Sequence, residues 1–326
     1  MAQHLCHADE DGLVSMHISI RGLVAVGILV ALGVFLVLRA LPSLSQAAPA
    51  AQAELSAYQV LERQWEDAFD RSPDGAYAEF LRIGRTLEYK DAHTLSHIIG
   101  EILYNRSGLA GLSVCTPHFG FGCYHGFAGK FVEERGVGAV NEFVTACKGP
   151  PHDSYCEHGI GHGLLAYLGD SKLTEALQLC PSGRSGSVGG CYNGVFMEYF
   201  VNNLRRESGG SVRPLDSALP EGSCSTISEK FRPACYYELP AWWRLSWFLS
   251  GATFDEQFKK IGQWCAAVAD AHLRAICFQG AGAQVAPFSE YDTARIQKTC
   301  SLMPTSGSDV CLAEALNAVA QMNIGP

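Results

Sequence analysis

The stretch CEHGIGHG at residues 156–163 decides the fold, because similar strings begin at five other cysteines. The strings are CYHGFAG (123–129), CYNGVFME (191–198), CYYELPAW (235–242), CFQGAGAQ (277–284) and CLAEALNA (311–318). Their opening cysteines, at 123, 156, 191, 235, 277 and 311, are therefore 33, 35, 44, 42 and 34 residues apart. A recurrence of this length predicts an array of structural repeats, each packed against its neighbours.

Each opening cysteine follows closely after another cysteine. An amphipathic stretch precedes the first cysteine of most pairs, as in residues 139–147 and 255–265, and an apolar stretch of helical character follows the second. The turn between them is polar or rich in glycine and proline. The sequence therefore predicts helix–loop–helix repeats in which a disulfide joins the end of one helix to the start of the next. The predicted disulfides are Cys115–Cys123, Cys147–Cys156, Cys180–Cys191, Cys224–Cys235, Cys265–Cys277 and Cys300–Cys311.

The predicted fold class is all-α, an α-solenoid of which six repeats carry a disulfide. A disulfide across such a short loop stabilises a repeat by up to about a few kcal/mol. Tetratricopeptide and Sel1-type arrays share this architecture, but the sequence lacks the signature residues of those families. Residues 202–222 form the longest interruption, which we interpret as a surface loop, with a functional flap as the alternative.

An apolar segment near the N-terminus suggests a membrane anchor. Residues 22–38 are all apolar or glycine, between Arg21 and Arg39, and approach the length that spans a bilayer. We therefore expect a short cytoplasmic tail, a transmembrane signal anchor, a linker and an extracytoplasmic helical-repeat domain, at residues 1–20, 21–41, 42–53 and 54–326. A cleaved signal peptide is the alternative.

The distribution of the thirteen cysteines gives the orientation. Twelve lie after the apolar segment and only Cys6 lies before it. Because disulfides persist in oxidising spaces, the repeat domain is expected in the periplasm, at the cell exterior or in a secretory lumen. A formal net charge of −9 argues against nucleic acid as a partner.

Histidines recur in the second helices of the first repeats. His125 and His158 each lie two residues after an opening cysteine, and His162 lies four residues beyond His158. The cysteine-free unit repeats this spacing, and we overlay Asp91–His97 on Cys156–His162. Residues four apart share one face of a helix, and neutral imidazole suits zinc, iron or copper. The predicted metal ligands are His93, His97, His125, His158 and His162.

Two acidic residues extend this hypothesis. Glu101 follows His97 by one helical turn, and Glu198 lies on the next second helix. Either is a candidate metal ligand or acid/base group. The glycines around the histidines, such as Gly126 and Gly161, would let backbones or a ligand approach closely. The competing interpretation is that the histidines only form hydrogen bonds between packed helices.

Known catalytic motifs do not decide the activity. The chain lacks HExxH, CxxC, GxSxG and Walker A sequences. Our hypothesis is therefore a membrane-anchored, extracytoplasmic metal-binding repeat protein, with a metal-dependent enzyme as its extension. The alternative is a non-catalytic scaffold whose concave face binds a protein or peptide.

The fourth repeat contains five aromatic residues close together: Tyr236, Tyr237, Trp242, Trp243 and Trp247. We interpret them as part of the core. The alternatives are a ligand groove or contact with the membrane.

Overall fold

The computed structural model describes residues 47–148, 153–181, 190–202, 204 and 212–323. Within these ranges the chain forms thirteen α-helices and short 3-10 helices, and it forms no strand, which confirms the all-α class. The chain divides into two units, residues 1–58 and 59–326, and the second unit contains the cysteine repeats. The predicted anchor at 21–41 lies outside the described residues. Among the described helices, none is both long enough and apolar enough to cross a bilayer.

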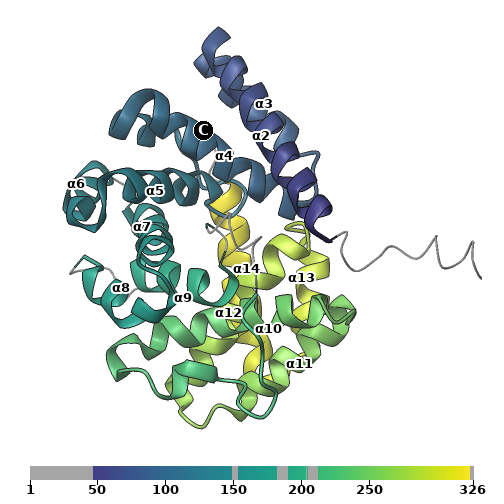
Figure 1. Cartoon of the computed structure of the whole chain (residues 1–326). Helices are drawn as coiled ribbons and strands as arrows, with labels where there is room; N and C mark the ends of the chain where they lie inside the picture. The colour runs from purple at the N-terminus through teal and green to yellow at the C-terminus, as the bar shows by residue number, and fades with distance from the viewer. Residues whose placement is uncertain (1–46, 149–152, 182–189, 203, 205–211, 324–326) are drawn as a thin grey trace, which may run out of the picture. The chain divides into compact units, whose positions relative to one another are not determined.

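The second helices of successive repeats form one continuous series (Figure 1). Each of them packs on the next one along the chain. The series consists of α4 (Tyr89–Ser107), α5 (Gly122–Arg135), α7 (Asp153–Leu168), α9 (Cys191–Val201), α10 (Arg232–Phe248), α12 (Ala271–Phe288) and α14 (Thr305–Asn323). This arrangement is the stacked-repeat packing that the cysteine period predicts.

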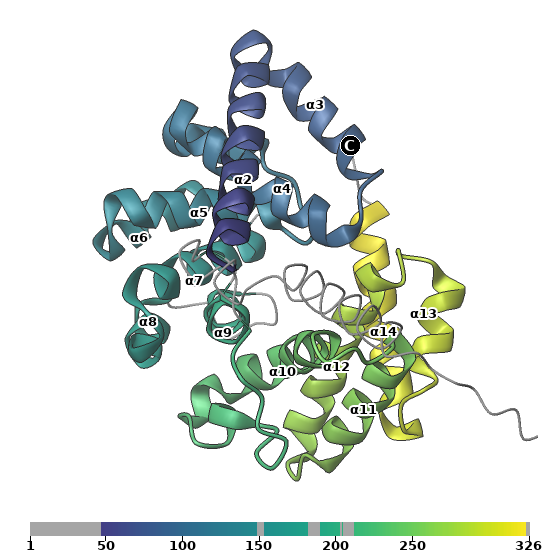
Figure 2. The same cartoon turned by 45° about the vertical axis from the view of Figure 1, so that its right-hand side comes forward.

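The first helices of the repeats lie at the periphery of this series (Figures 1 and 2). They are α6 (Val140–Ala146), α8 (Leu173–Leu179), α11 (Phe254–Ala267) and α13 (Thr293–Cys300), and α2 (Ala47–Arg71) and α3 (Pro73–Gly84) precede the first repeat. Sequence-local signals fix several of their ends. A reciprocal capping box between Thr253 and Glu256 begins α11, for example.

Six disulfides join the six predicted cysteine pairs. Their Cα atoms lie 5.5 to 5.7 Å apart, and all twelve cysteines are buried. Each disulfide joins the N-terminal part of a second helix to the segment that precedes it, and in α12 and α14 the cysteine is the seventh residue of the helix. The set indicates that this unit matures in an oxidising environment.

Two repeats depart from the predicted helix–loop–helix pattern. In the first, Cys115 follows a 3-10 helix at Gly108–Val114, and in the fourth, Cys224 lies within a 3-10 helix at Gly222–Ser225. Both segments begin at a glycine with a φ of +52°, a conformation that interrupts an α-helix. The expectation of an α-helix before every pair was therefore wrong for these two repeats.

Glycines set the close contact between second helices. A Cβ atom on Gly126 would lie 2.0 Å from the carbonyl oxygen of His97, and one on Gly194 would lie 1.9 Å from that of His158. In the other direction, a Cβ atom on Gly100 would lie 2.1 Å from the carbonyl oxygen of Cys123. Since no side chain fits in such a space, these glycines bring the backbone of α4 close to that of α5, and the backbone of α7 close to that of α9.

The aromatic cluster of the fourth repeat belongs mainly to the core. Trp242 and Trp243 are buried, and Trp243 makes an edge contact with Trp264 of α11 at a ring-centroid distance of 5.0 Å. The indole nitrogens of Trp242 and Trp243 donate to the backbone carbonyls of Arg213 and Pro220. The core interpretation of these tryptophans is therefore confirmed.

Candidate metal centre

The structure brings all five predicted histidines together at the contact of α4, α5 and α7. Among the described residues, they form two groups of three whose ligand atoms lie within 4.8 Å of one another. The first His group is His93, His97 and His125, and the second His group is His125, His158 and His162. His125, on the middle helix, belongs to both.

The first His group is held by a hydrogen bond from outside it. Nδ1 of His93 donates to the carbonyl oxygen of Phe119 at 2.7 Å, so the proton of the neutral ring lies on Nδ1. The unprotonated Nε2 of His93 lies 3.1 Å from Nε2 of His97. Nδ1 of His125 lies 3.3 Å from the same His97 atom. Three imidazole nitrogens thus converge on one small volume.

The second His group is arranged in a similar way. Nδ1 of His162 donates to a carboxylate oxygen of Glu198 at 3.0 Å, which leaves Nε2 of His162 unprotonated. This Nε2 lies 3.3 Å from Nε2 of His158. The ring of His125 lies beside both, with centroid distances of 4.3 Å to His162 and 5.0 Å to His158.

Hydrogen bonds alone do not satisfy His125. Its Nε2 is buried and has no hydrogen-bond partner among the described residues. If Nε2 of His125 carries the proton, that proton has no acceptor among the described residues. If Nδ1 carries it and donates to Nε2 of His97, then Nε2 of His97 has no proton to donate to His93. The lone pairs on Nε2 of His97 and Nε2 of His93 then face each other at 3.1 Å. A buried polar atom without a partner is costly. A cation between the rings would remove this conflict, because lone pairs facing each other are the arrangement that a metal requires.

The protein keeps these rings in the form that binds metals. Burial lowers the pKa of His93 and of His158, and it lowers the pKa of His162 to about 3. For His125, burial and the four neighbouring imidazoles lower the pKa well below its ordinary value. The neutral ring is therefore the stable form near pH 7, and neutral imidazole is the metal ligand.

The two acidic candidates occupy different places. Glu198 contacts the outer nitrogen of His162 and also accepts a hydrogen bond from the backbone N–H of Leu204 at 3.1 Å. It thus orients a candidate ligand, as carboxylates next to metal-binding histidines commonly do. Glu101 is buried on α4 but belongs to neither His group.

The helix contacts correct the overlay of the cysteine-free unit. Gly126 of α5 packs on the carbonyl of His97, and Gly194 of α9 packs on that of His158. His97 is therefore the counterpart of His158, which is one helical turn away from the predicted overlay. By the same register Glu101 corresponds to His162, and His93 is an addition of the first repeat. The histidines still converge in this corrected register, because residues four apart lie on the same face of a helix.

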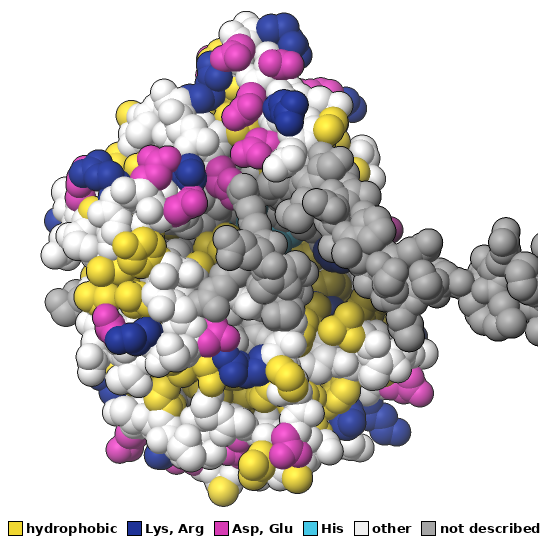
Figure 3. Space-filling model, in the orientation of Figure 1, with side chains coloured by type: hydrophobic (Ala, Val, Ile, Leu, Met, Phe, Trp, Pro, Cys, Tyr) yellow, Lys and Arg dark blue, Asp and Glu magenta, His cyan; other side chains and the backbone are white. Residues whose placement is uncertain are grey.

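The two His groups differ in their access to solvent. The second His group is fully buried, whereas His93 of the first is partly exposed. Tyr89 covers part of His93, with stacked rings 6.0 Å apart. Figure 3 shows a small histidine surface in a hollow, beside apolar and basic side chains. Of the two groups, only the first thus has a histidine with solvent-exposed surface.

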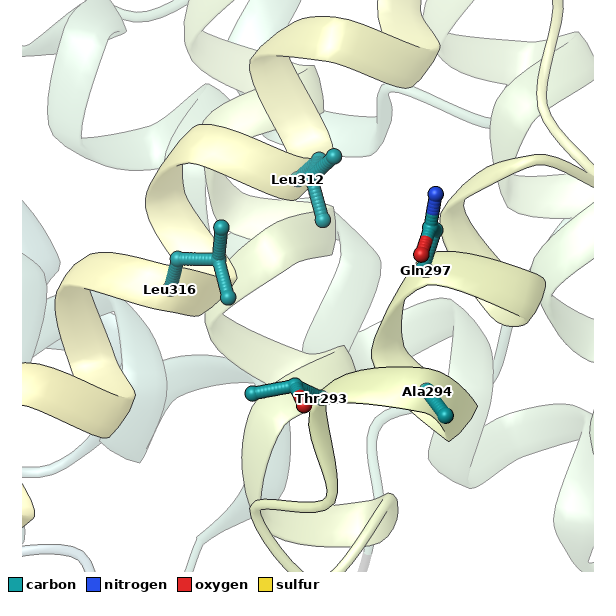
Figure 4. Close-up of a pocket in the computed structure, with 5 residues that line it drawn as sticks. All are labelled: Thr293, Ala294, Gln297, Leu312 and Leu316. Atoms are coloured by element: carbon teal, nitrogen blue, oxygen red, sulfur yellow. The ribbon is translucent and has the colours of Figure 1, made fainter.

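A separate pocket between α13 and α14 has no comparable chemistry. It has a volume of about 300 Å³ and is lined by Thr293, Ala294, Gln297, Leu312 and Leu316 (Figure 4). None of these side chains is ionisable or a usual metal ligand. The candidate site of this protein is therefore the histidine cluster.

Sequence reasoning missed the backbone partner of His93 and the aromatic neighbour of that ring. The carbonyl of Phe119 belongs to a turn in which Phe119 and Phe121 have positive φ values, and no sequence pattern predicted this turn. Tyr89 lies four residues before His93, a spacing that could have indicated the contact.

In the comparisons with known proteins, no family model, curated protein or solved structure matches the chain.

Proposed function

We propose that the protein binds a transition metal, of the zinc, iron or copper class, through the histidine cluster of α4, α5 and α7. One observation carries the proposal: five largely buried imidazoles form two three-nitrogen groups in which outer hydrogen bonds already orient two of the rings. Purely structural histidines do not need lone pairs that face one another. Neutral imidazole suits all three of these metals.

The proposal extends to a metal-dependent reaction at the first His group. Three protein ligands leave a coordination position open, which is the arrangement of reactive metal sites rather than closed structural ones. The partial exposure of His93 supports this extension, because a substrate could reach only that group. In this proposal the protein works outside the cytoplasm, tethered by the apolar segment at residues 21–41.

Elemental analysis of the purified full chain tests the proposal. Wild type is compared with a His93→Ala/His158→Ala variant, which removes one ligand from each group. The matched control is His272→Ala, because His272 lies outside both His groups, in the first turn of α12. We expect stoichiometric metal in wild type and control, and a large loss in the double variant, with the helical content retained.

The opposite result favours another function. If wild type contains no metal after reconstitution with zinc, iron or copper salts, the histidines are structural. In that case a double variant that melts much earlier than wild type supports the scaffold hypothesis, in which the concave face binds an extracytoplasmic protein or peptide.

A further inference from the structure

We infer that the cluster holds two metal ions and that His125 bridges them, one ion on each ring nitrogen. This inference rests on the proposed function and extends it from a metal site to a dinuclear centre. The two His groups have only His125 in common. Two ions bound by three histidines each must therefore share this ring.

The two nitrogens of His125 differ in their surroundings. Nδ1 lies 3.3 Å from Nε2 of His97 and so belongs to the first His group. Nε2 is buried without a hydrogen-bond partner among the described residues, while the ring lies beside the rings of both α7 histidines. The first ion takes the Nδ1 lone pair of the neutral ring, whose proton is then on Nε2. When the second ion binds, the Nε2–H bond breaks, the proton leaves to solvent, and the freed Nε2 lone pair binds that ion.

The outer ligands are prepared for the same division. His93 and His162 are the end members of the cluster, and each donates from Nδ1 to an oxygen acceptor outside it. Their Nε2 lone pairs therefore face inward, one in each group. His97 and His158 complete the groups with Nε2 atoms at 3.1 and 3.3 Å from those lone pairs. Each ion thus receives two terminal histidines and one nitrogen of the bridge.

Copper is a suitable probe, because two Cu(II) ions joined by an imidazolate ring couple magnetically. The metal-free full chain is titrated with Cu(II), and bound copper is counted by elemental analysis while unpaired spins are counted by EPR. We expect two copper ions per chain and a spin count well below the copper count at low temperature. A chain that saturates at one copper, or binds two with a full spin count, would overturn the bridge.

Two variants separate the bridge from the sites. His158→Ala/His162→Ala leaves the first His group complete, so we expect one copper ion per chain with its full spin count. His125→Ala should lose the coupling, and a coupled pair that persists in this variant contradicts the inference. His118→Ala, in a nearby loop, is the control and should keep two coupled ions.

The same titration distinguishes the inference from the proposed function. Absence of stoichiometric copper, zinc and iron in wild type removes the proposed function and the bridge together. A wild-type chain that binds a single ion, which is lost on replacement of His93 or His97, retains the proposed function and removes only the bridge. Circular dichroism of each variant shows that the comparison is made on folded protein.

Discussion

The ring of Tyr89, at the start of α4, lies edge-on to the ring of Phe288, at the end of α12, with 5.2 Å between the centroids. The guanidinium carbon of Arg244 lies 3.5 Å from the centroid of the same Phe288 ring. The series of second helices thus curls until the sixth meets the first. Because Tyr89 also stacks on His93, this contact between the sixth and the first helix lies beside the first His group.

Truncation of Phe288 tests this closing contact. Phe288→Ala removes the edge contact with Tyr89 and the cation–π contact with Arg244, so we expect a loss of about 2–3 kcal/mol in the free energy of unfolding. Metal affinity should also fall, since Tyr89 no longer supports His93. Urea denaturation and a chelator competition measure the two effects. Phe248→Ala is the control, because Phe248 is 62% exposed and should contribute little.

Gly126 offers a test of the helix spacing. In Gly126→Ala the new methyl group would overlap the carbonyl of His97, so α4 and α5 must separate. We expect a destabilisation of about 2–3 kcal/mol despite the better helix propensity of alanine, together with weaker metal binding. At Gly138 a Cβ atom meets nothing within 4 Å, so Gly138→Ala should leave both quantities nearly unchanged. Equal behaviour of the two variants would exclude our account of the spacing.

Replacement of Glu198 tests its role as the partner of His162. Glu198→Gln keeps the shape of the side chain but removes the negative charge that fixes the Nδ1 proton of His162. Losses of about 10- to 100-fold in metal affinity are typical of such outer partners. Isothermal titration with zinc measures the change. Glu142→Gln serves as the control, since Glu142 forms an exposed ion pair with Arg135 and belongs to neither His group. An unchanged affinity in Glu198→Gln would show that this carboxylate does not support a ligand.

The raised pKa of Glu238 leads us to predict that the free energy of unfolding depends on pH, whether or not metal is bound. Burial raises the pKa of this carboxyl to about 8, although Nδ2 of Asn193 donates to it at 3.1 Å. The folded chain therefore holds a proton between about pH 4.5 and 8 that the unfolded chain releases, and stability falls as pH rises through this window. We expect Glu238→Gln to remove a pH-dependent loss of about a few kcal/mol. Urea denaturation at pH 5, 7 and 9 provides the comparison, with the exposed Glu175→Gln as control.

The second and sixth disulfides form a matched pair for separating stability from metal binding. Replacing Cys147 and Cys156 with serine opens a short loop and should cost about 2–3 kcal/mol. It should also weaken metal binding, because Cys156 fixes the start of α7 two residues before His158. Serine at Cys300 and Cys311 should cost similar stability and leave the metal affinity unchanged. If both pairs affect metal binding equally, the disulfide acts only through global stability.

Much of the fold could be predicted because cysteine spacing and helical periodicity are local features of the sequence. Cys147 and Cys156 lie nine residues apart, so the chain between them permits few other pairings. The convergence of His125 with His158 was also predictable, since both follow their cysteine by two residues. In contrast, the meeting of Tyr89 with Phe288 depends on the summed rotation of every repeat, and no single repeat encodes it.

The overlay of the cysteine-free unit, Asp91–His97, on Cys156–His162 was wrong by one helical turn, and the error has a clear physical cause. His93 and His97 lie four residues apart, as do His158 and His162, so two registers place a histidine on the same helix face. Only the neighbouring helix distinguishes them, because Gly126 can approach the backbone of His97 and nothing bulkier fits there. Side-chain periodicity reveals which face is used, whereas the contact between backbones determines the register.

The complete burial of His162 has a consequence for the biogenesis of the protein. An ion bound there would be enclosed by α5, α7 and α9, and the disulfides at Cys123, Cys156 and Cys191 fix the starts of these three helices. Insertion after oxidation would require these helices to part, so acquisition during maturation would be the faster route. The metal that the cell supplies while the chain is still reduced would then decide which element the finished protein carries, and later exchange would be slow.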